Sequence, residues 1–127
     1  GRTTPSGTCR TPFKAAWHPL QGCGGQYCTQ ITGNYLFHSS PYNSPNKNDL
    51  SYRLYNQLGT VCSHGCVRLT VADAKWIYDN CPLGTTVSIY NASSLPVPKP
   101  SAPWLDISSP NRGWDPTDPD PANPWNK

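Results

Sequence analysis

Proline is distributed unevenly along this chain of 127 residues, and its distribution limits the possible fold more than any other feature. Nine of the 15 prolines lie after Leu95. Because proline fixes its own φ angle and lacks a backbone N–H, such a segment is poorly suited to regular helix or central strand. We therefore expect one domain over residues 1–94, with a truncated set of N-terminal strands as one possibility. Residues 95–127 are expected to form a Pro/Trp-rich C-terminal tail.

The tail also carries large apolar side chains that are unusual in a solvated linker. They are Trp104, Leu105, Ile107, Trp114 and Trp125. The Leu95–Pro100 stretch favours polyproline geometry. Two interpretations stay open, a disordered tail and a tail that packs along the domain.

Charge and hydropathy exclude two classes of partner. The formal net charge is only +3, and no basic run or interleaving of basic and aromatic residues occurs, so no nucleic acid is expected to bind. No apolar stretch approaches the ~20 residues of a membrane span, so we expect no transmembrane segment in this chain. Methionine is absent and no signal peptide is present, which predicts a missing upstream segment for secretion or anchoring.

Cysteine is abundant for a protein of a reducing compartment. The six are Cys9, Cys23, Cys28, Cys62, Cys66 and Cys81. Their density favours an oxidising, extracytoplasmic location or a metal site. If Cys66 is free, five cysteines remain, so at most two disulfides can form and one further thiol is left over. The pairs Cys62–Cys81 and Cys23–Cys28 are hypotheses.

Strands are predicted around a polar excursion. The aromatic and apolar residues 35–37 favour a strand within residues 29–39, which places His38 near its end. Residues 8–28 show no clear period, and His18 is expected in a loop. Residues 41–60 are predicted to be a loop with one helical turn around residues 50–55.

The later part of the domain has clearer periodicity. Thr70 followed by Asp73 is typical of a helix start, and apolar residues at helical spacing predict a helix over residues 71–80. Residues 61–69 are expected to be extended, with an unusual backbone at residues 64–66. Val87 and Ile89 alternate with polar residues, which predicts a half-buried strand over residues 85–90.

Cys66 is the candidate nucleophile, in the segment Ser63-His64-Gly65-Cys66-Val67-Arg68 just before the predicted helix. A thiol with a pKa near ~8.5 is only slightly ionised at neutral pH, so it needs help from helix-start amides, a guanidinium or an imidazole. Gly65 lets the backbone approach a substrate closely and direct amides at an oxyanion. From the residues alone, a Cys66 that forms half of a disulfide is as well supported as a Cys66 that acts as a nucleophile.

This segment resembles the signature of the L,D-transpeptidases, the YkuD-type catalytic domains that crosslink peptidoglycan. The similarity continues through residues 69–75, Gly84-Thr85 and residues 87–90, and upstream through Thr4-Pro5-Ser6-Gly7-Thr8 and Phe37-His38-Ser39. It covers about 90 residues. The resemblance implies a mainly β fold, a sandwich-like mixed sheet with one short helix after the catalytic strand.

The resemblance also implies roles for individual residues. Cys66 matches the nucleophile, His38 matches the histidine that accepts its proton, and Ser39 matches the position whose carbonyl orients that imidazole. His64 and Gly65 match the residues beside the nucleophile, where the amides of Gly65 and Cys66 would form an oxyanion hole.

Substrate binding is assigned in the same way to Arg68, with Ser63 and Tyr35. A guanidinium suits bidentate binding of a carboxylate, although a structural salt bridge is an equal alternative for Arg68. Strand geometry also allows His64 to meet Cys66, so the preference for His38 rests on the resemblance.

The implied reaction is a transfer of an acyl group through a cysteine thioester. Cys66 attacks the third residue of a donor stem peptide, and an amine from an acceptor stem peptide resolves the thioester as a 3→3 crosslink. Water as acceptor would make the protein an L,D-carboxypeptidase. The resemblance further implies acylation by carbapenem-type β-lactams, a role in cell-wall biogenesis and cell shape, location in the cell wall or periplasm, and no cofactor or metal.

Other functions and a departure from the family pattern stay open. A non-enzymatic, disulfide-stapled wall-binding module would use the tail as its ligand surface. A zinc site of Cys62, His64 and Cys66 is disfavoured because this spacing matches no common zinc motif. Residues 41–60 form an apparent insertion, either a surface loop or a lid with contacts from three tyrosines, Tyr42, Tyr52 and Tyr55.

Overall fold

A four-stranded mixed sheet forms the centre of the molecule. The computed structural model describes residues 4–20, 23–60, 63, 65–94, 97 and 101–126. The strand order is β2-β3-β4-β5, with antiparallel pairs up to β4 and a parallel pair between β4 and β5. The strands are β2 (Lys14–Leu20), β3 (Cys23–Thr32), β4 (Tyr35–Ser39) and β5 (Val67–Leu69).

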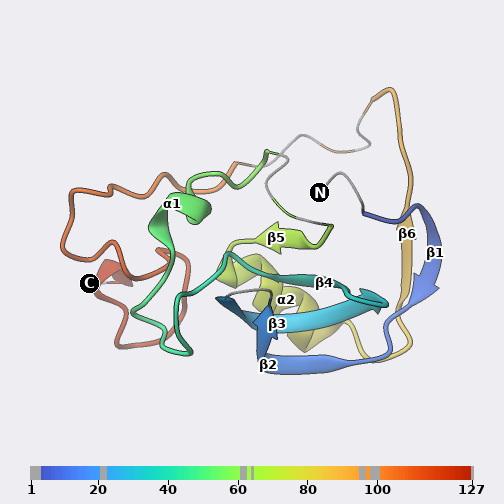
Figure 1. Ribbon diagram of the computed structural model, residues 1–127, viewed down its shortest axis with the longest axis horizontal. Helices are drawn as coiled ribbons and strands as arrows, with labels where there is room; N and C mark the ends of the chain where they lie inside the picture. The colour runs from blue at the N-terminus through green and yellow to red at the C-terminus, as the bar shows by residue number, and fades with distance from the viewer. Residues whose placement is uncertain are drawn as a thin grey trace.

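A second sheet and two α-helices complete the described part of the fold (Figure 1). The antiparallel strands β1 (Gly7–Arg10) and β6 (Thr86–Ile89) lie beside one end of the four-stranded sheet, and α2 (Val71–Asn80) packs against that sheet. The other helix is α1 (Tyr52–Tyr55), and a 3-10 turn, η1 (Pro124–Asn126), lies near the C-terminus. The predicted mainly β fold with a mixed sheet is confirmed, and a short helix follows β5 as expected.

The strand predicted within residues 29–39 is two strands joined by a turn. Gly33 has a φ of +54°, a left-handed conformation that glycine adopts without a Cβ clash, and this reverses the chain between β3 and β4. Residues 8–28, which showed no period, contain β1, β2 and the start of β3. His18 is therefore on a strand, and its predicted place in a loop is wrong.

The helix over residues 71–80 is confirmed with its predicted start. The Thr70 side chain accepts a hydrogen bond from the Asp73 N–H at 3.3 Å, so it satisfies one of the free amides of the first turn. In β6, Val87 and Ile89 are half-buried and alternate with exposed residues, as predicted. No helix among the described residues is long and apolar enough to cross a bilayer.

The main hydrophobic cluster is built by the polar excursion, helix α2 and the tail together. Its buried members are Tyr42, Leu50, Tyr55, Val71 and Leu105. One helical turn, α1, forms within residues 41–60 as predicted. Tyr42 and Tyr55 are 0% and 1% exposed and belong to this core, while the role of residues 41–60 as a surface loop or a lid stays a prediction.

The tail runs alongside α1 and the polar excursion (Figure 1). Asn56 binds the backbone of Leu105 on both sides, accepting from its N–H at 3.0 Å and donating to its carbonyl at 2.8 Å. The Gly113 carbonyl accepts from the Leu50 N–H at 2.9 Å. These contacts favour the packed interpretation of the tail, while the boundary at residue 94 stays a prediction.

Candidate active site

A cavity of about 610 Å³ opens between β2, the β3–β4 turn and the start of β5. Its size is within the range of small-molecule sites. Five of the sequence-predicted site residues line it together: Tyr35, His38, Ser63, Cys66 and Arg68. Ser39 and Gly65 are buried outside the lining, and His64 lies outside the described residues.

Parallel pairing of β4 and β5 brings the proposed base and nucleophile to one cavity. His38 is paired with Arg68 in this register, and Cys66 directly precedes β5. The His38 side chain is only 2% exposed, and its Nδ1 is hydrogen-bonded to the Ser39 carbonyl. Because a carbonyl oxygen only accepts, Nδ1 carries the hydrogen and Nε2 is left with the lone pair.

Burial sets the protonation state of this imidazole. Removal from solvent lowers the pKa of His38 to about 4, although the hydrogen bond to Ser39 acts in the opposite direction. The positive charge of Arg68, and then His18, lower that pKa further. His38 is therefore neutral at pH 7 and can accept a proton through Nε2.

Cys66 is half-buried and lies next to the β3–β4 turn. Its Sγ donates a hydrogen bond to the Asn34 carbonyl at 3.5 Å. The thiol is thus held at the cavity by a weak bond, because a thiol is a weak hydrogen-bond donor.

A tight turn precedes Cys66, and the side chain of Ser63, a residue of that turn, stabilises it. Ser63 Oγ donates to the Cys66 carbonyl at 2.6 Å and accepts the Gly65 N–H at 3.2 Å. Gly65 has a φ of +144°, which L side chains rarely adopt, and its carbonyl accepts from the Thr4 hydroxyl at 2.5 Å. The expected unusual backbone is present at Gly65, and the other part of that expectation, at His64, is outside the described residues.

Other cysteines lie near the cavity but differ in reactivity. Cys28 is 0% exposed, and burial raises the pKa of its thiol to about 12, so it stays protonated. Cys23 lines the cavity. Burial raises the pKa of Cys23, and the charge of Arg68 opposes that effect.

The structure contradicts the proposed disulfide between Cys23 and Cys28. Cys28 is a free thiol, and the two residues are five positions apart on the extended strand β3, about 16 Å at the usual rise per residue. A disulfide needs Cα atoms within about 7 Å. The other hypothesis, a Cys62–Cys81 pair, involves Cys62, which lies outside the described part of the chain, so that pairing stays a prediction.

Several cavity residues were missed by the sequence analysis. They are Phe13, His18, Pro19, Leu20, Cys23, Gln30, Gly33, Asn34 and Leu36. Those from β2 follow from the pairing of β2 with the glycine-containing start of β3, a long-range contact that leaves no local motif. His18 hydrogen-bonds the Pro19 carbonyl through Nδ1 at 2.7 Å.

A second cavity, of about 810 Å³, lies on the other side of Arg68. Its walls come from α1 and the residues after it, the start of α2, and the tail through Trp104 and Thr117. Arg68 lines both cavities.

Zinc ligation by Cys62, His64 and Cys66 is not tested by the structure, because the first two residues lie outside its described part. Within that described part, no group of three or more His, Cys, Asp or Glu side chains is arranged to hold a metal ion.

Comparison with known proteins gives one family. The family model for the L,D-transpeptidase catalytic domain (YkuD) matches residues 1–89. A curated protein of Bacillus subtilis (strain 168), named "Putative L,D-transpeptidase YciB", is 40% identical over 91 residues. That alignment covers 68% of this chain and 46% of the Bacillus protein, so the chain spans about half the length of that relative.

Two solved structures are similar. One is a fused Zn-dependent amidase/peptidase/peptidoglycan-binding domain-containing protein from Clostridium acetobutylicum ATCC 824, 37% identical, with a TM-score of 0.50 over 68% of this chain and 34% of that one. The other is an L,D-transpeptidase (Yku) from Stackebrandtia nassauensis, 20% identical, with a TM-score of 0.52 over 72% of this chain and 40% of that one. The second likeness concerns the fold alone.

Proposed function

The chain belongs to the L,D-transpeptidase (YkuD) catalytic-domain family, and from this premise we propose that it forms 3→3 crosslinks between peptidoglycan stem peptides. The observation that carries this proposal is that His38 and Cys66 line one cavity, with the imidazole neutral and its Nε2 available as a proton acceptor. We further propose that the protein works outside the cytoplasm, in the cell wall or periplasm where its substrate lies.

In the first half-reaction, the thiol proton of Cys66 passes to Nε2 of His38 while Sγ attacks the carbonyl carbon of the third stem residue. The low pKa of His38 means that this transfer accompanies attack, because an imidazolium formed in advance would be disfavoured. The tetrahedral intermediate then collapses. The bond to the terminal D-amino acid breaks, and the imidazolium gives its proton to the leaving amine.

Backbone amides of the turn are the proposed oxyanion hole. The Gly65 N–H is at present bonded to Ser63 Oγ at 3.2 Å, and this long bond would be exchanged for one to the developing oxyanion. Ser63 would remain bonded to the Cys66 carbonyl and so hold the turn. Arg68 is proposed to bind a substrate carboxylate, and Tyr35 to contact the donor peptide, since both line the cavity.

In the second half-reaction, an amine of an acceptor stem peptide attacks the thioester carbonyl, with neutral His38 taking the amine proton. The thiolate of Cys66 leaves and is reprotonated by that imidazolium, which closes the cycle. Attack by water instead would release a shortened stem peptide, the carboxypeptidase outcome.

Covalent labelling tests the nucleophile. Incubation with a carbapenem should add one β-lactam mass to the protein by intact-mass spectrometry, because the thiol opens the lactam ring. The adduct should disappear in Cys66→Ala and persist in Cys9→Ala and Cys81→Ala, which remove free thiols outside the cavity. An adduct that survives Cys66→Ala would overturn the assignment.

Product analysis tests the reaction. Purified tetrapeptide-bearing muropeptides should yield crosslinked dimers and free D-amino acid with the wild-type protein, and neither with His38→Ala or Cys66→Ala. Tripeptide products without dimers would support the carboxypeptidase instead. Absence of all products, with Cys66 in a disulfide by thiol titration, would support the wall-binding module.

A further inference from the structure

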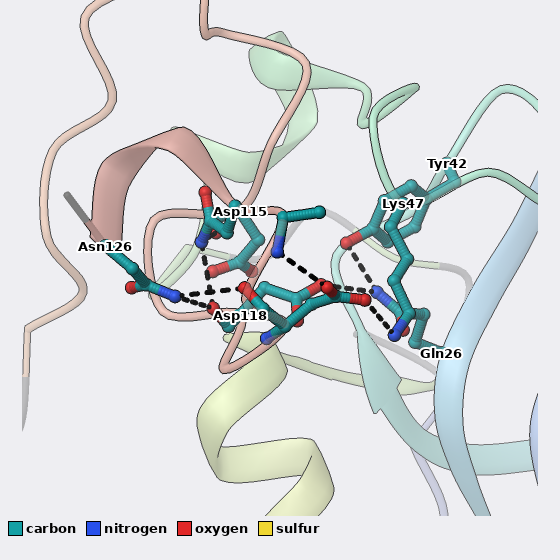
Figure 2. Close-up of polar contacts among 9 residues, drawn as sticks. Gln26, Tyr42, Lys47, Asp115, Asp118 and Asn126 are labelled. Carbon is teal, nitrogen blue, oxygen red and sulfur yellow. Dashed lines mark hydrogen bonds and ion pairs between the residues drawn. The ribbon is translucent and has the colours of Figure 1, made fainter.

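The tail contacts both structural units that carry the proposed base and nucleophile, although it lies beyond the residues that the family model matches. We refer to residues 101–126 as the C-terminal clasp. Figure 2 shows its central polar contacts, in which Asp118 lies between Gln26 of β3 on one side and Asn126 on the other.

The first contact caps the helix that follows the nucleophile strand. Asp115 Oδ2 accepts the Val71 N–H at 3.0 Å, and Thr117 Oγ1 accepts the Ala72 N–H at 3.0 Å. Together with Thr70, these side chains satisfy the first three amides of α2. Because only β5 and Thr70 separate Cys66 from α2, the clasp holds the unit on which the thiol is mounted.

The second contact leads to the proposed base. The Gln26 side chain is 1% exposed, and its Nε2 donates to Asp118 Oδ2 at 3.2 Å and to the Tyr42 hydroxyl at 2.8 Å (Figure 2). The Gln26 backbone N–H donates to Ser39 Oγ at 2.9 Å, and the Ser39 carbonyl holds Nδ1 of His38. Asp118 is thus connected to the imidazole through two residues.

The two contacts are joined inside the clasp. Asn123 is 0% exposed, and its amide nitrogen donates to the carbonyls of Asp115 and Asp118 at 3.0 and 2.9 Å. One side chain therefore fixes the backbone from which both carboxylates project. The helix cap and the Gln26 contact cannot move independently without breaking a buried hydrogen bond.

Burial of these carboxylates argues for more than packing. Asp115 and Asp118 are both 0% exposed, and neither is in direct ion-pair contact with a described residue, although the Lys47 ammonium acts on Asp118 from a longer distance. A buried carboxylate without a cation in direct contact costs free energy, whereas apolar side chains would attach a segment without that cost. What carboxylates add is directional hydrogen bonding to specific donors.

We propose that Asp115 and Asp118 are positioning residues, which through the C-terminal clasp hold the β5–α2 unit of Cys66 and the β3–β4 unit of His38 in one arrangement. The identity of the reaction rests on the proposed function, but the positioning of the thiol does not. Misplacement by about 1 Å can cost up to a hundredfold in rate, so loss of one clasp contact should be measurable.

The test compares Asp118→Ala with the conservative Asp118→Asn and with Asp120→Ala. Asp120 lies in the same segment but bonds Lys47 and the Ala122 N–H, away from Gln26 and α2. Two measurements are made. The first is the rate at which iodoacetamide alkylates Cys66 across pH, quantified on the Cys66 peptide, and the second is kcat and KM for crosslinking. Thermal melting monitors the fold.

Asp118→Ala should lower both the alkylation rate and kcat by about tenfold, with KM changed less than about twofold. Asp118→Asn, which still offers an oxygen to Gln26, should recover most of this loss, and Asp120→Ala should match wild type. Wild-type rates in an Asp118→Ala protein whose melting temperature is lowered would overturn the proposal, because the contact would then be purely structural.

If Asp118→Ala does not fold, Thr117→Val replaces it, since this isosteric change removes only the hydroxyl that accepts the Ala72 N–H and donates to Asp115 Oδ1. It should lower the Cys66 alkylation rate about threefold, and an unchanged rate would overturn the proposal. If the wild-type protein makes no product, only the proposed function is contradicted, because the comparison of Cys66 alkylation rates does not depend on turnover. Normal wild-type turnover with no effect of Asp118→Ala would sink the positioning role alone.

Discussion

Gly25 lies directly against His38: a Cβ at Gly25 would come within 3.2 Å of Nδ1 and 3.4 Å of Cβ of the histidine. Gly25 is on β3, and His38 is near the end of β4. The absence of a side chain at this position therefore leaves room for the imidazole, whose Nδ1 is hydrogen-bonded to the Ser39 carbonyl.

Substitution of Gly25 by alanine should impair the base more than the fold. The added methyl would press on the imidazole and on Leu20, at 3.1 Å, so the bond from Nδ1 to Ser39 should weaken and crosslinking kcat should fall about tenfold. Gly24→Ala is the matched control, since a methyl there meets only the His18 carbonyl at 3.8 Å. Equal kcat values for the two variants would contradict this account.

Acidification should destabilise the protein through His38. Its pKa falls from 6.5 in the unfolded chain to about 4 in the folded one, so between these values only the unfolded state takes up the proton. Stability is thus fully present above pH 6.5 and is lost as pH falls toward 4, by about 3 kcal/mol in total for this group. Urea unfolding at pH 7.5 and 4.5 measures the loss.

The matched variant for that measurement is His38→Gln, which has no titratable group at the position. Its loss of stability between the two pH values should be smaller than that of wild type by about 2–3 kcal/mol. Parallel losses in the two proteins would assign the acid sensitivity to other groups.

Gly113 should be intolerant of any side chain. A Cβ there would lie 2.2 Å from the Asn48 carbonyl oxygen, a backbone atom that cannot turn away, and the Gly113 carbonyl accepts from Leu50 in the same contact. We expect Gly113→Ala to cost more than about 2 kcal/mol in unfolding free energy and to detach the clasp near the polar excursion. Hydrogen exchange at the Leu50 amide reports that detachment, and unchanged protection there would contradict it.

The tail should contribute directly to global stability through Leu105. This side chain is 1% exposed in the main hydrophobic cluster, so Leu105→Ala should cost about 2–5 kcal/mol by denaturant unfolding. Its neighbour Trp104 is 78% exposed, and Trp104→Ala should stay within about 0.5 kcal/mol of wild type. Similar losses for the two variants would mean that residues 104–105 do not pack as described.

Much of the local structure follows from the sequence because it depends on neighbouring residues. Thr70 and Asp73 predict the start of α2 because the cap closes within one turn, and Val87 with Ile89 predicts β6 through its alternation. The strands around residues 8–28 could not be predicted, since their residues are only half apolar and their partners lie elsewhere in the chain.

The candidate site divides in the same way. The motif around Cys66 identifies the candidate nucleophile through its resemblance to the family signature, which can be recognised because its residues are contiguous. The place of His18 in the cavity could not be predicted, because it depends on the pairing of β2 with the start of β3. The predicted Cys23–Cys28 disulfide is wrong for a geometric reason, because an extended strand holds residues that are five positions apart too far from each other to bond.

By itself, the sequence determined the helix over residues 71–80, because its signals lie in adjacent residues. Through its resemblance to one family, the sequence also determined the mainly β class and the identity of the proposed nucleophile. Only the tertiary structure decided how Cys66 and His38 come to one cavity, why position 25 has no side chain, and what the proline-rich tail contacts. These depend on β4–β5 pairing and on buried hydrogen bonds between distant segments, whose free energy exists only once the chain has folded.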